Sequence, residues 1–168
     1  MASTPEFALE RLLQSLTQAK VDFVVVGGVA VVVQGSPRFT RDLDICYATG
    51  QKNLDKLGQL LMALDARLRG IEEDVPFVPD GRTLRHAQMV TLTTRDGDLD
   101  LLASPAGSPG YPALKRKASR IDLDGHTVLI ASIDDLIAMK SAAGRPQDLV
   151  DLESLRVARR HARRQPDR

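Results

Sequence analysis

The sequence contains one cysteine, Cys46, so no disulfide can form within the chain. It also lacks an apolar run long enough to cross a bilayer, because the longest one, at residues 23–33, is interrupted by Gly27 and Gly28. The first residues, MASTPEFALERLL, lack the basic and then apolar layout of a signal peptide. A low cysteine count is typical of a reducing compartment. We therefore expect a cytoplasmic protein with no membrane partner.

The composition that remains is that of an ordinary globular protein. Of the 168 residues, 43% are hydrophobic and 27% are charged, which excludes a disordered chain. A chain of this length fits one domain and can bury a core without disulfides or a structural metal.

The net charge of +1 is unevenly distributed along the chain. The last 13 residues carry six arginines and one aspartate, and the remaining 155 residues have a net charge of −4. A basic end on an acidic body is a candidate contact for nucleic acid. The alternative is a solvated helix end, because basic terminal segments are common.

Hydrophobic periodicity predicts alternating helices and strands. Thr4 and Pro5 begin a helix in which four leucines, from Leu9 to Leu16, share one face. Further helices are expected at residues 29–34, 53–68, 133–143 and from 146 through the arginine-rich end. Strands are expected at residues 21–26, 41–47, 89–95, 98–102, 121–124 and 127–130, with a loop at 103–113. This order predicts an α+β (mixed α/β) fold, in which helices pack on a mixed sheet and a helical extension follows.

The first expected strand runs directly into Gly27 and Gly28 and then into a helix. Glycines at such a junction let the backbone approach a ligand closely, and free N–H groups at the start of a helix favour anions. The junction is therefore a candidate site for the oxygens of a triphosphate. The alternative is a tight strand-to-helix turn, which also requires glycine.

Asp42 and Asp44 lie two residues apart on a predicted strand, so their side chains leave the same face. Leu43 and Ile45 are expected to point the other way, toward the core. Adjacent carboxylates repel unless a cation or a proton lies between them, and Mg²⁺ favours carboxylate and phosphate oxygens. The pair thus indicates a divalent metal site. The alternative is a solvated polar face on an edge strand.

Asp100 is a third candidate ligand, because it interrupts the apolar run of residues 99–102 and a charge there is costly without a partner. If its strand lies beside that of Asp42 and Asp44, three carboxylates converge and can hold two metal ions about 4 Å apart. Asp100 is then also the candidate base for an attacking hydroxyl. Asp98 shares its face, but its place beside the Asp-Gly turn predicts that it is exposed. The alternative for Asp100 is a hydrogen-bonded strand aspartate.

Lys140 continues the inward-facing stripe of the helix expected at residues 133–143. A lysine at such a position either extends to solvent or meets an anion. Asp148 and Asp151 follow on the next helix, three residues apart and therefore on one face. Asp151 is a candidate for orienting Lys140 or a base, whereas helix capping is sufficient to explain Asp148.

Together these motifs resemble the nucleotidyltransferase superfamily of the polymerase-beta type, in which a glycine pair is followed, about a dozen residues later, by Asp-x-Asp. The matching positions in the first half are Gly27, Gly28, Ala30, Gly35, Arg38, Thr40 and residues 42–45. Residues 136–140 and 144–152 are similar to the branch that contains the abortive-infection and mycobacterial nucleotidyltransferase toxins.

The resemblance implies a minimal nucleotidyltransferase fold, with a catalytic core at residues 1–130 and C-terminal helices at 131–168 that complete the site and end in a basic tail at 156–168. It implies Mg²⁺ or Mn²⁺ on Asp42 and Asp44, and an NTP as substrate. It also implies that Lys140 lies at the triphosphate and that Asp151 or Asp148 is a further essential acid. The residues expected to contact the nucleotide are Gly27, Gly28, Arg38, Thr40, Lys140 and Asp148.

The expected reaction transfers a nucleoside monophosphate from the NTP to an acceptor hydroxyl, as in relatives that add nucleotides to the 3′ end of tRNA. RNA is the expected acceptor, and an antitoxin protein is the expected partner. One departure is that Gly28 replaces the serine usual in the family, so that backbone N–H groups take the place of a hydroxyl. Two alternatives are a non-catalytic nucleotide-binding antitoxin or partner module and an enzyme that adds AMP to a protein hydroxyl.

Overall fold

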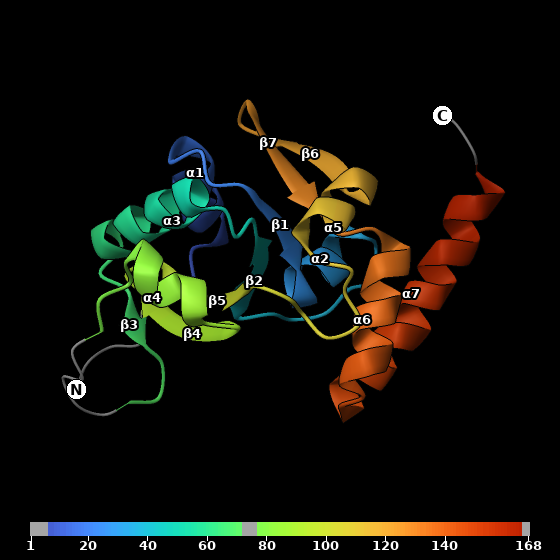
Figure 1. Ribbon diagram of the computed structural model, residues 1–168. Coiled ribbons are helices and arrows are strands. Elements are labelled where there is room, and N and C mark those ends of the chain that lie inside the picture. The colour runs from blue at the N-terminus through green and yellow to red at the C-terminus, as the bar shows by residue number, and fades with distance from the viewer. Residues whose placement is uncertain (1–6, 72–76, 166–168) are drawn as a thin grey trace.

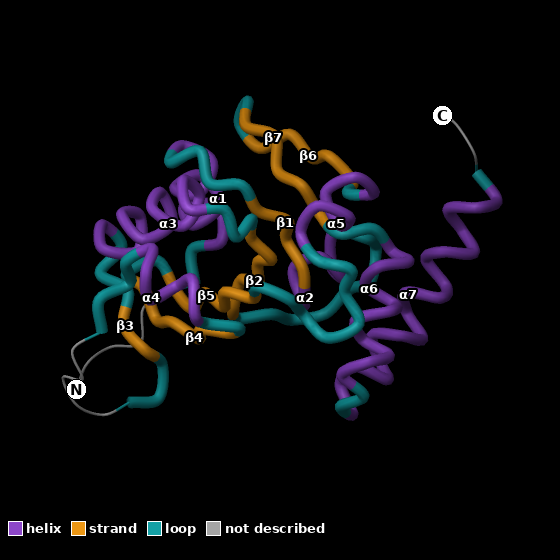
Figure 2. The backbone as a smooth tube through the Cα atoms, in the orientation of Figure 1, coloured by secondary structure: helices purple, strands orange, loops and turns teal. Residues whose placement is uncertain are grey.

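The computed structural model describes residues 7–71 and 77–165, so the helix start expected at Thr4 and Pro5 lies outside the described residues. A mixed seven-stranded sheet has the strand order β3-β4-β5-β2-β1-β7-β6 (Figures 1 and 2). β2 pairs in parallel with β5, and β1 with β7, whereas the other neighbours are antiparallel. The strands are β1 (Phe23–Val26), β2 (Asp42–Tyr47), β3 (Arg67–Leu68), β4 (Met89–Thr94), β5 (Gly97–Leu102), β6 (Ser119–Leu123) and β7 (His126–Ile130).

Helices pack on this sheet, which confirms the expected α+β fold. α1 and α3 lie at one end of the molecule, and α6 and α7 pack against each other at the other end (Figure 1). No helix among the described residues is both long and apolar enough to span a membrane. The helices are α1 (Leu9–Gln18), α2 (Gly27–Val33), α3 (Gln51–Ala63), α4 (Gly81–His86), α5 (Tyr111–Lys117), α6 (Ile133–Ala143) and α7 (Pro146–Arg164).

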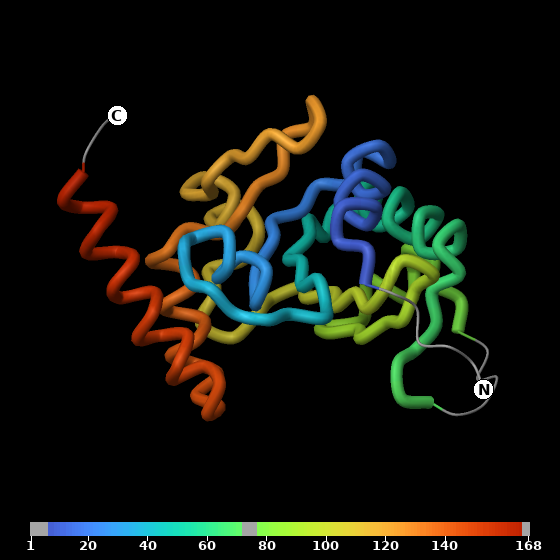
Figure 3. The backbone as a smooth tube through the Cα atoms, turned by 180° about the vertical axis from the view of Figure 1, so that it is seen from behind, coloured from blue at the N-terminus to red at the C-terminus, as the bar shows by residue number. Residues whose placement is uncertain are grey.

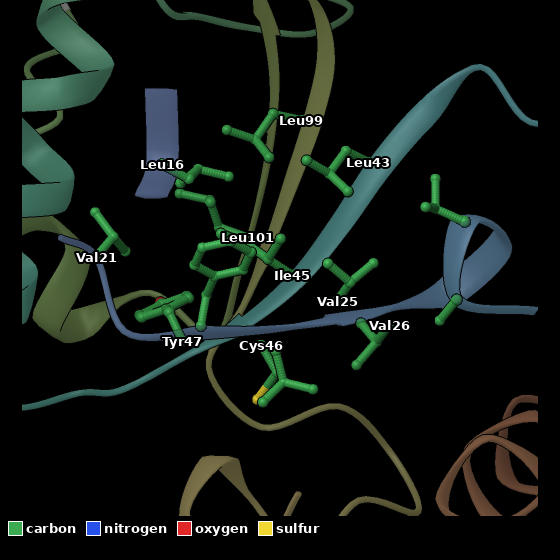
Figure 4. Packing of buried hydrophobic residues seen from close by; sticks show 14 of the residues in the cluster. Leu16, Val21, Val25, Val26, Leu43, Ile45, Cys46, Tyr47, Leu99 and Leu101 are labelled. Carbon is green, nitrogen blue, oxygen red and sulfur yellow. The ribbon is translucent and has the colours of Figure 1, made fainter. Parts of the chain in front are cut away.

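Part of the core lies on one face of β2 and β5. Leu43 of β2 and Leu99 of β5 are opposite each other in the register and are fully buried. They point to the same side as Leu16 of α1 (Figure 4). Because side chains alternate along a strand, burial of Leu43 directs Asp42 and Asp44 to the opposite face.

The helix expected at residues 53–68 ends earlier than predicted. α3 ends at Ala63, Asp65 adopts a positive φ of 51°, and the chain returns as β3 to pair with β4. The apolar spacing continues to Leu68, but that side chain belongs to the strand. The prediction was wrong because apolar residues around a tight turn kept a helical spacing by chance.

Two short helices are absent from the sequence-based prediction. In α4, the side chain of Asp80 accepts a hydrogen bond of 2.8 Å from the backbone N–H of Thr83. α5 begins at Tyr111, inside the loop expected at residues 103–113. Helices of six and seven residues are too short for apolar periodicity to identify them.

Candidate active site

β1 passes directly into α2 at Gly27 and Gly28. Gly27 has a φ of +64°, and a β-carbon at this position would overlap the carboxylate of Asp44. A β-carbon at Gly28 would lie 2.9 Å from Thr40 Oγ1. Both positions therefore need glycine because other side chains approach the backbone closely. The hydroxyl of Thr40 occupies the space beside Gly28 into which a serine side chain would project.

The parallel pairing of β2 and β5 places Asp44 beside Asp100 and Asp42 beside Asp98. Carboxylate oxygens of Asp42, Asp44 and Asp100 all lie within 4.8 Å of one another. The convergence expected from the sequence is thus present. Asp98 departs from its expectation, because its side chain is only 27% exposed and accepts a hydrogen bond of 2.9 Å from Thr93 Oγ1. The cause is β4, which flanks β5 and places Thr93 opposite Asp98.

The environment of Asp44 opposes its ionisation. Burial raises the pKa of Asp44 from 3.8 to about 6, and the charge of Asp42 adds to this effect. Lys140, the Gly28 backbone and Arg69 act in the opposite direction without offsetting it. A cation between the carboxylates would stabilise the ionised form.

Arg69 is a charged residue of the site that the sequence pattern did not single out. Its Nη1 lies 3.8 Å from Asp42 Oδ2, and its Nε lies 3.6 Å from Asp98 Oδ2. Its Nη2 also donates to Asp100 Oδ1. The available signal was the alternation of residues 67–69, Arg-Leu-Arg, which is typical of a strand with one buried face. Residues 67 and 68 were assigned to the end of the expected helix, which hid this alternation.

Lys140 is 7% exposed and does not extend to solvent. Its Nζ lies 3.0 Å from Asp148 Oδ1 and 3.0 Å from Asp151 Oδ2. Arg38 also donates to Asp151 Oδ2, at 2.6 Å from Nη1. Arg38 belongs to the segment at residues 34–41, which lies on the near side in Figure 3. The ion pairs with Asp148 and Asp151 thus hold the ammonium group of Lys140 in place, and Asp151 is shared with Arg38.

Asp148 has no exposed surface. Burial alone would raise its pKa, but hydrogen bonds from Arg145 and Lys140 outweigh the burial and lower the pKa from 3.8 to about 2. Arg145 donates to Asp148 Oδ2 from its backbone nitrogen at 3.0 Å and from Nε at 2.8 Å. Asp148 thus caps α7 and binds Lys140 at the same time, so capping is only part of its role.

A pocket of about 480 Å³ lies between these groups. The carboxylates of the acidic cluster line it, as do Gly27, Gly28 and Lys140. Its volume is in the range of pockets that bind small organic ligands. The rest of the lining is largely apolar and includes Val26, Met89, Leu102, Pro105, Ala106, Leu136, Met139 and Ala143.

The donor set of the acidic cluster fits a divalent cation such as Mg²⁺ or Mn²⁺. Three carboxylates supply the hard oxygen ligands that these ions prefer. Burial and, after it, the charge of Asp42 raise the pKa of Asp44, and a positive charge between the carboxylates would oppose both effects.

A family model described as "Nucleotidyl transferase AbiEii toxin, Type IV TA system" matches residues 11–159. The chain belongs to this family. The matched range includes the glycine pair, the acidic cluster and Lys140, and it confirms the toxin branch expected from the motifs. The chain is therefore a nucleotidyltransferase, which favours an enzyme over the non-catalytic alternative. No curated protein matches the chain in sequence.

Solved structures share the fold at low sequence identity. The lincosamide antibiotic adenylyltransferase LnuA, with lincomycin bound, superposes with a TM-score of 0.60 at 17% identity, covering 89% of this chain and 94% of that chain. The antibiotic-resistance factor ANT(2'')-Ia gives a TM-score of 0.54 at 16% identity, covering 90% and 80% respectively. An antigenic nucleotidyltransferase-like protein from Paracoccidioides brasiliensis gives 0.53 at 21% identity, covering 88% and 72%.

Replacing Gly27 with alanine is expected to disrupt the site. The added β-carbon must displace the carboxylate of Asp44, and a misplacement of about 1 Å in an active site can cost about a hundredfold in rate. The left-handed backbone adds about 1 kcal/mol of strain. Gly125→Ala is the matched control, since Gly125 has a φ of +80° and no atom within 4 Å of the added carbon. Transfer assays and urea unfolding should show reduced stability in both variants but reduced transfer in Gly27→Ala alone.

Proposed function

We propose that the chain transfers a nucleoside monophosphate from an NTP to a hydroxyl of RNA, with pyrophosphate as the leaving group. The observation that carries the proposal is that three converging carboxylates of β2 and β5 and the buried Lys140 all line the same pocket. Such a site can neutralise the charge of a triphosphate and position its α-phosphorus, which is the main requirement of phosphoryl transfer.

Asp42, Asp44 and Asp100 are the proposed ligands of Mg²⁺ or Mn²⁺. When bound, the metal supplies positive charge to the phosphate oxygens and lowers the pKa of the attacking hydroxyl. Asp100 is the proposed base: it accepts the hydroxyl proton while the oxygen forms a bond to the α-phosphorus and the bond to pyrophosphate breaks.

The triphosphate is proposed to lie between the glycine pair and Lys140. Lys140 and Arg38 supply positive charge, Gly27 and Gly28 supply backbone N–H groups, and Thr40 supplies a hydroxyl next to Gly28. Asp148 and Asp151 hold the ammonium group of Lys140 in place through the 3.0 Å ion pairs. They are thus positioning residues for the lysine.

RNA is the proposed acceptor because of the charge on α7. Arg156, Arg160, Arg163 and Arg164 are exposed there, and clustered arginines bind the phosphate backbone. The 3′ end of tRNA, which has a free hydroxyl, is the first choice. A protein hydroxyl is the second, and a small-molecule hydroxyl is the third, because LnuA is an antibiotic adenylyltransferase.

The domain assignment made from the sequence is also a proposal. Residues 1–130 would form the core and residues 131–168 would complete the site, since α6 and α7 supply Lys140, Asp148 and Asp151. An antitoxin encoded with the chain is a proposed partner, because the family description names a toxin–antitoxin system. A cytoplasmic location fits an RNA acceptor.

The test is transfer of label from each α-labelled NTP, with Mg²⁺, to purified tRNA, to a mixture of cell proteins and to lincomycin in parallel. Label on tRNA that is removed by nuclease supports the proposal. Label that appears only on protein or lincomycin, or no label with any NTP, contradicts it.

Neutralising arginines on α7 is expected to weaken RNA binding. A variant with Arg160, Arg163 and Arg164 changed to glutamine should lose about two to three phosphate contacts. The slope of log affinity against log salt concentration should become less steep by about 0.7 to 0.9 for each lost contact. The control changes Lys52, Lys56 and Arg82 to glutamine on α3 and α4, at the other end of the molecule (Figure 1). Filter binding from low to high salt measures both slopes. Equal slopes for the two variants would exclude α7 as the RNA contact.

A further inference from the structure

The guanidinium of Arg69 lies among the carboxylates that form the proposed metal site. It pairs with Asp42 at 3.8 Å and with Asp98 at 3.6 Å, and it donates to Asp100. Its side chain is 30% exposed, whereas that of Asp100 is 8% exposed. The arginine is thus the immediate counter-ion of the cluster in the metal-free protein.

The sheet places Arg69 at this position. The backbone N–H of Arg69 donates to the carbonyl of Thr91 at 3.0 Å, which extends the pairing of β3 with β4 by one residue. Thr91 is opposite Asp100, and Asp100 is opposite Asp44. The four residues therefore form one row across neighbouring strands, and the arginine reaches the acids from a fixed backbone rather than from a long loop.

A guanidinium and a divalent cation compete for the same oxygens. Arg69 contacts carboxylate oxygens of Asp42 and Asp100, two of the three proposed ligands. Two positive groups on the same carboxylates repel each other, so binding of one disfavours binding of the other. The Nε of Arg69 is buried without a hydrogen-bond partner among the described residues, so the guanidinium is not held by a complete set of bonds.

Asp98 gives the arginine a partner outside the metal ligands. It lies on the same face as Asp100, two residues earlier on β5, and Thr93 holds its carboxylate at 2.9 Å. Asp98 is not part of the cluster of three acids whose oxygens converge. The guanidinium is thus able to keep one ion pair after it has left the other two.

We infer that Arg69 is a positioning residue that substitutes for the metal: it holds Asp42 and Asp100 together in the metal-free protein and moves to Asp98 when the metal binds. The inference rests on the proposed metal site. It predicts that Arg69 weakens metal binding in the absence of NTP. An arginine that only stabilises the fold, or only binds phosphate, would not weaken it.

The first test is Mn²⁺ binding by the full-length, chelator-treated protein without NTP, measured by electron paramagnetic resonance of free Mn²⁺. Arg69→Gln should bind Mn²⁺ about tenfold more tightly than the wild type, because no guanidinium has to be displaced. Arg69→Lys, which keeps the charge but loses the planar fork, should lie between them. Arg67→Gln is the matched control: it lies two residues away on the same face, its side chain is 72% exposed and its partner is Asp65.

The second test is thermal unfolding of the same variants. In chelator, Arg69→Gln should unfold at a lower temperature than Arg67→Gln, because the acids have lost their counter-ion. Saturating Mn²⁺ should remove this difference. A deficit that persists with saturating Mn²⁺ would contradict the inference.

A double-variant cycle tests the transfer to Asp98. Asp98→Asn should weaken Mn²⁺ binding more in the wild type than in Arg69→Gln, since only the former has an arginine to accommodate. Equal effects in both backgrounds would exclude Asp98 as the receiving group.

The outcomes separate this inference from the proposed function. If neither the wild type nor Arg69→Gln binds Mn²⁺, the metal site itself is wrong. If both bind it equally tightly, the metal site stands and the role assigned to Arg69 is wrong. Weaker binding by Arg69→Gln would likewise overturn the inference.

Discussion

Asp44→Asn is expected to abolish nucleotide transfer and to stabilise the metal-free protein. Loss of a proposed metal ligand should lower the rate by about a thousandfold or more, because a bound metal would supply several kcal/mol of transition-state stabilisation. The same change removes a buried charge that the fold disfavours, as the raised pKa of about 6 indicates. The expected gain in the free energy of unfolding is about 3 kcal/mol at neutral pH, at about 1.4 kcal/mol per pKa unit. Transfer assays and urea unfolding in chelator measure the two effects.

The stabilisation by Asp44→Asn should depend on pH in a defined direction. The pKa of Asp44 is higher in the folded state, about 6, than its ordinary value of 3.8. The destabilising charge is therefore fully present above the folded pKa and decreases as the pH falls toward the unfolded one. The difference in unfolding free energy between variant and wild type should be largest above about pH 7, decrease as the pH falls through about 6, and vanish only below the unfolded pKa of 3.8.

Asp65→Asn is the control, because that side chain is 74% exposed and pairs only with Arg67 in the described chain. It should leave both transfer and stability nearly unchanged. Asp44→Asn with unchanged transfer would contradict the metal assignment. Asp44→Asn without a stability gain would instead mean that Asp44 is satisfied in the metal-free protein.

The acidic pair could be found in the sequence because its signal is local. Asp42 and Asp44 alternate with Leu43, and this period of two places them on one face without any knowledge of the tertiary structure. Asp100 was visible for the opposite reason, because a charge stands out in an apolar run. The glycine pair followed from the junction of a strand with a helix. Each of these signals is contained in a few consecutive residues.

Arg69 and Asp98 depend on tertiary contacts and so escaped prediction. Arg69 reaches the acids only because β3 pairs with β4 at the edge of the sheet. A strand of two residues is too short for its sequence to predict this pairing. Asp98 is covered because Thr93 lies opposite it. In the fold, α6 and the start of α7 matched their predicted positions because Gly144 and Pro146 mark the break between them.

Lys140 combines a local signal with a long-range consequence. Its place on the inward stripe of α6 was readable, but the choice between solvent and an anion was not. The structure places its ammonium group between Asp148, which has no exposed surface, and Asp151, which is 1% exposed. Arg145 and Arg38 also pair with these aspartates. The lysine thus links α6 to α7 and at the same time lines the pocket.

Lys140→Met should therefore cost both stability and activity. Removing one partner of a buried ion pair costs about 3 to 5 kcal/mol, and the lower end is expected here because Arg145 and Arg38 still pair with the aspartates. The loss of the positive charge that is proposed to contact the triphosphate should lower the rate by about a hundredfold or more. Urea unfolding measures the first effect, and transfer at a temperature at which circular dichroism shows every variant folded measures the second.

The double variant Lys140→Met with Asp151→Asn separates the two roles. Removing one aspartate along with the lysine leaves less uncompensated charge, so the double variant should lose less stability than the sum of the single variants. Its transfer rate should stay as low as that of Lys140→Met, because the stabilised helix pair still lacks the cation proposed to contact the triphosphate. If folded Lys140→Met transfers nucleotide at nearly the wild-type rate, the lysine serves only to hold α7, and the triphosphate must be neutralised by the metal and Arg38.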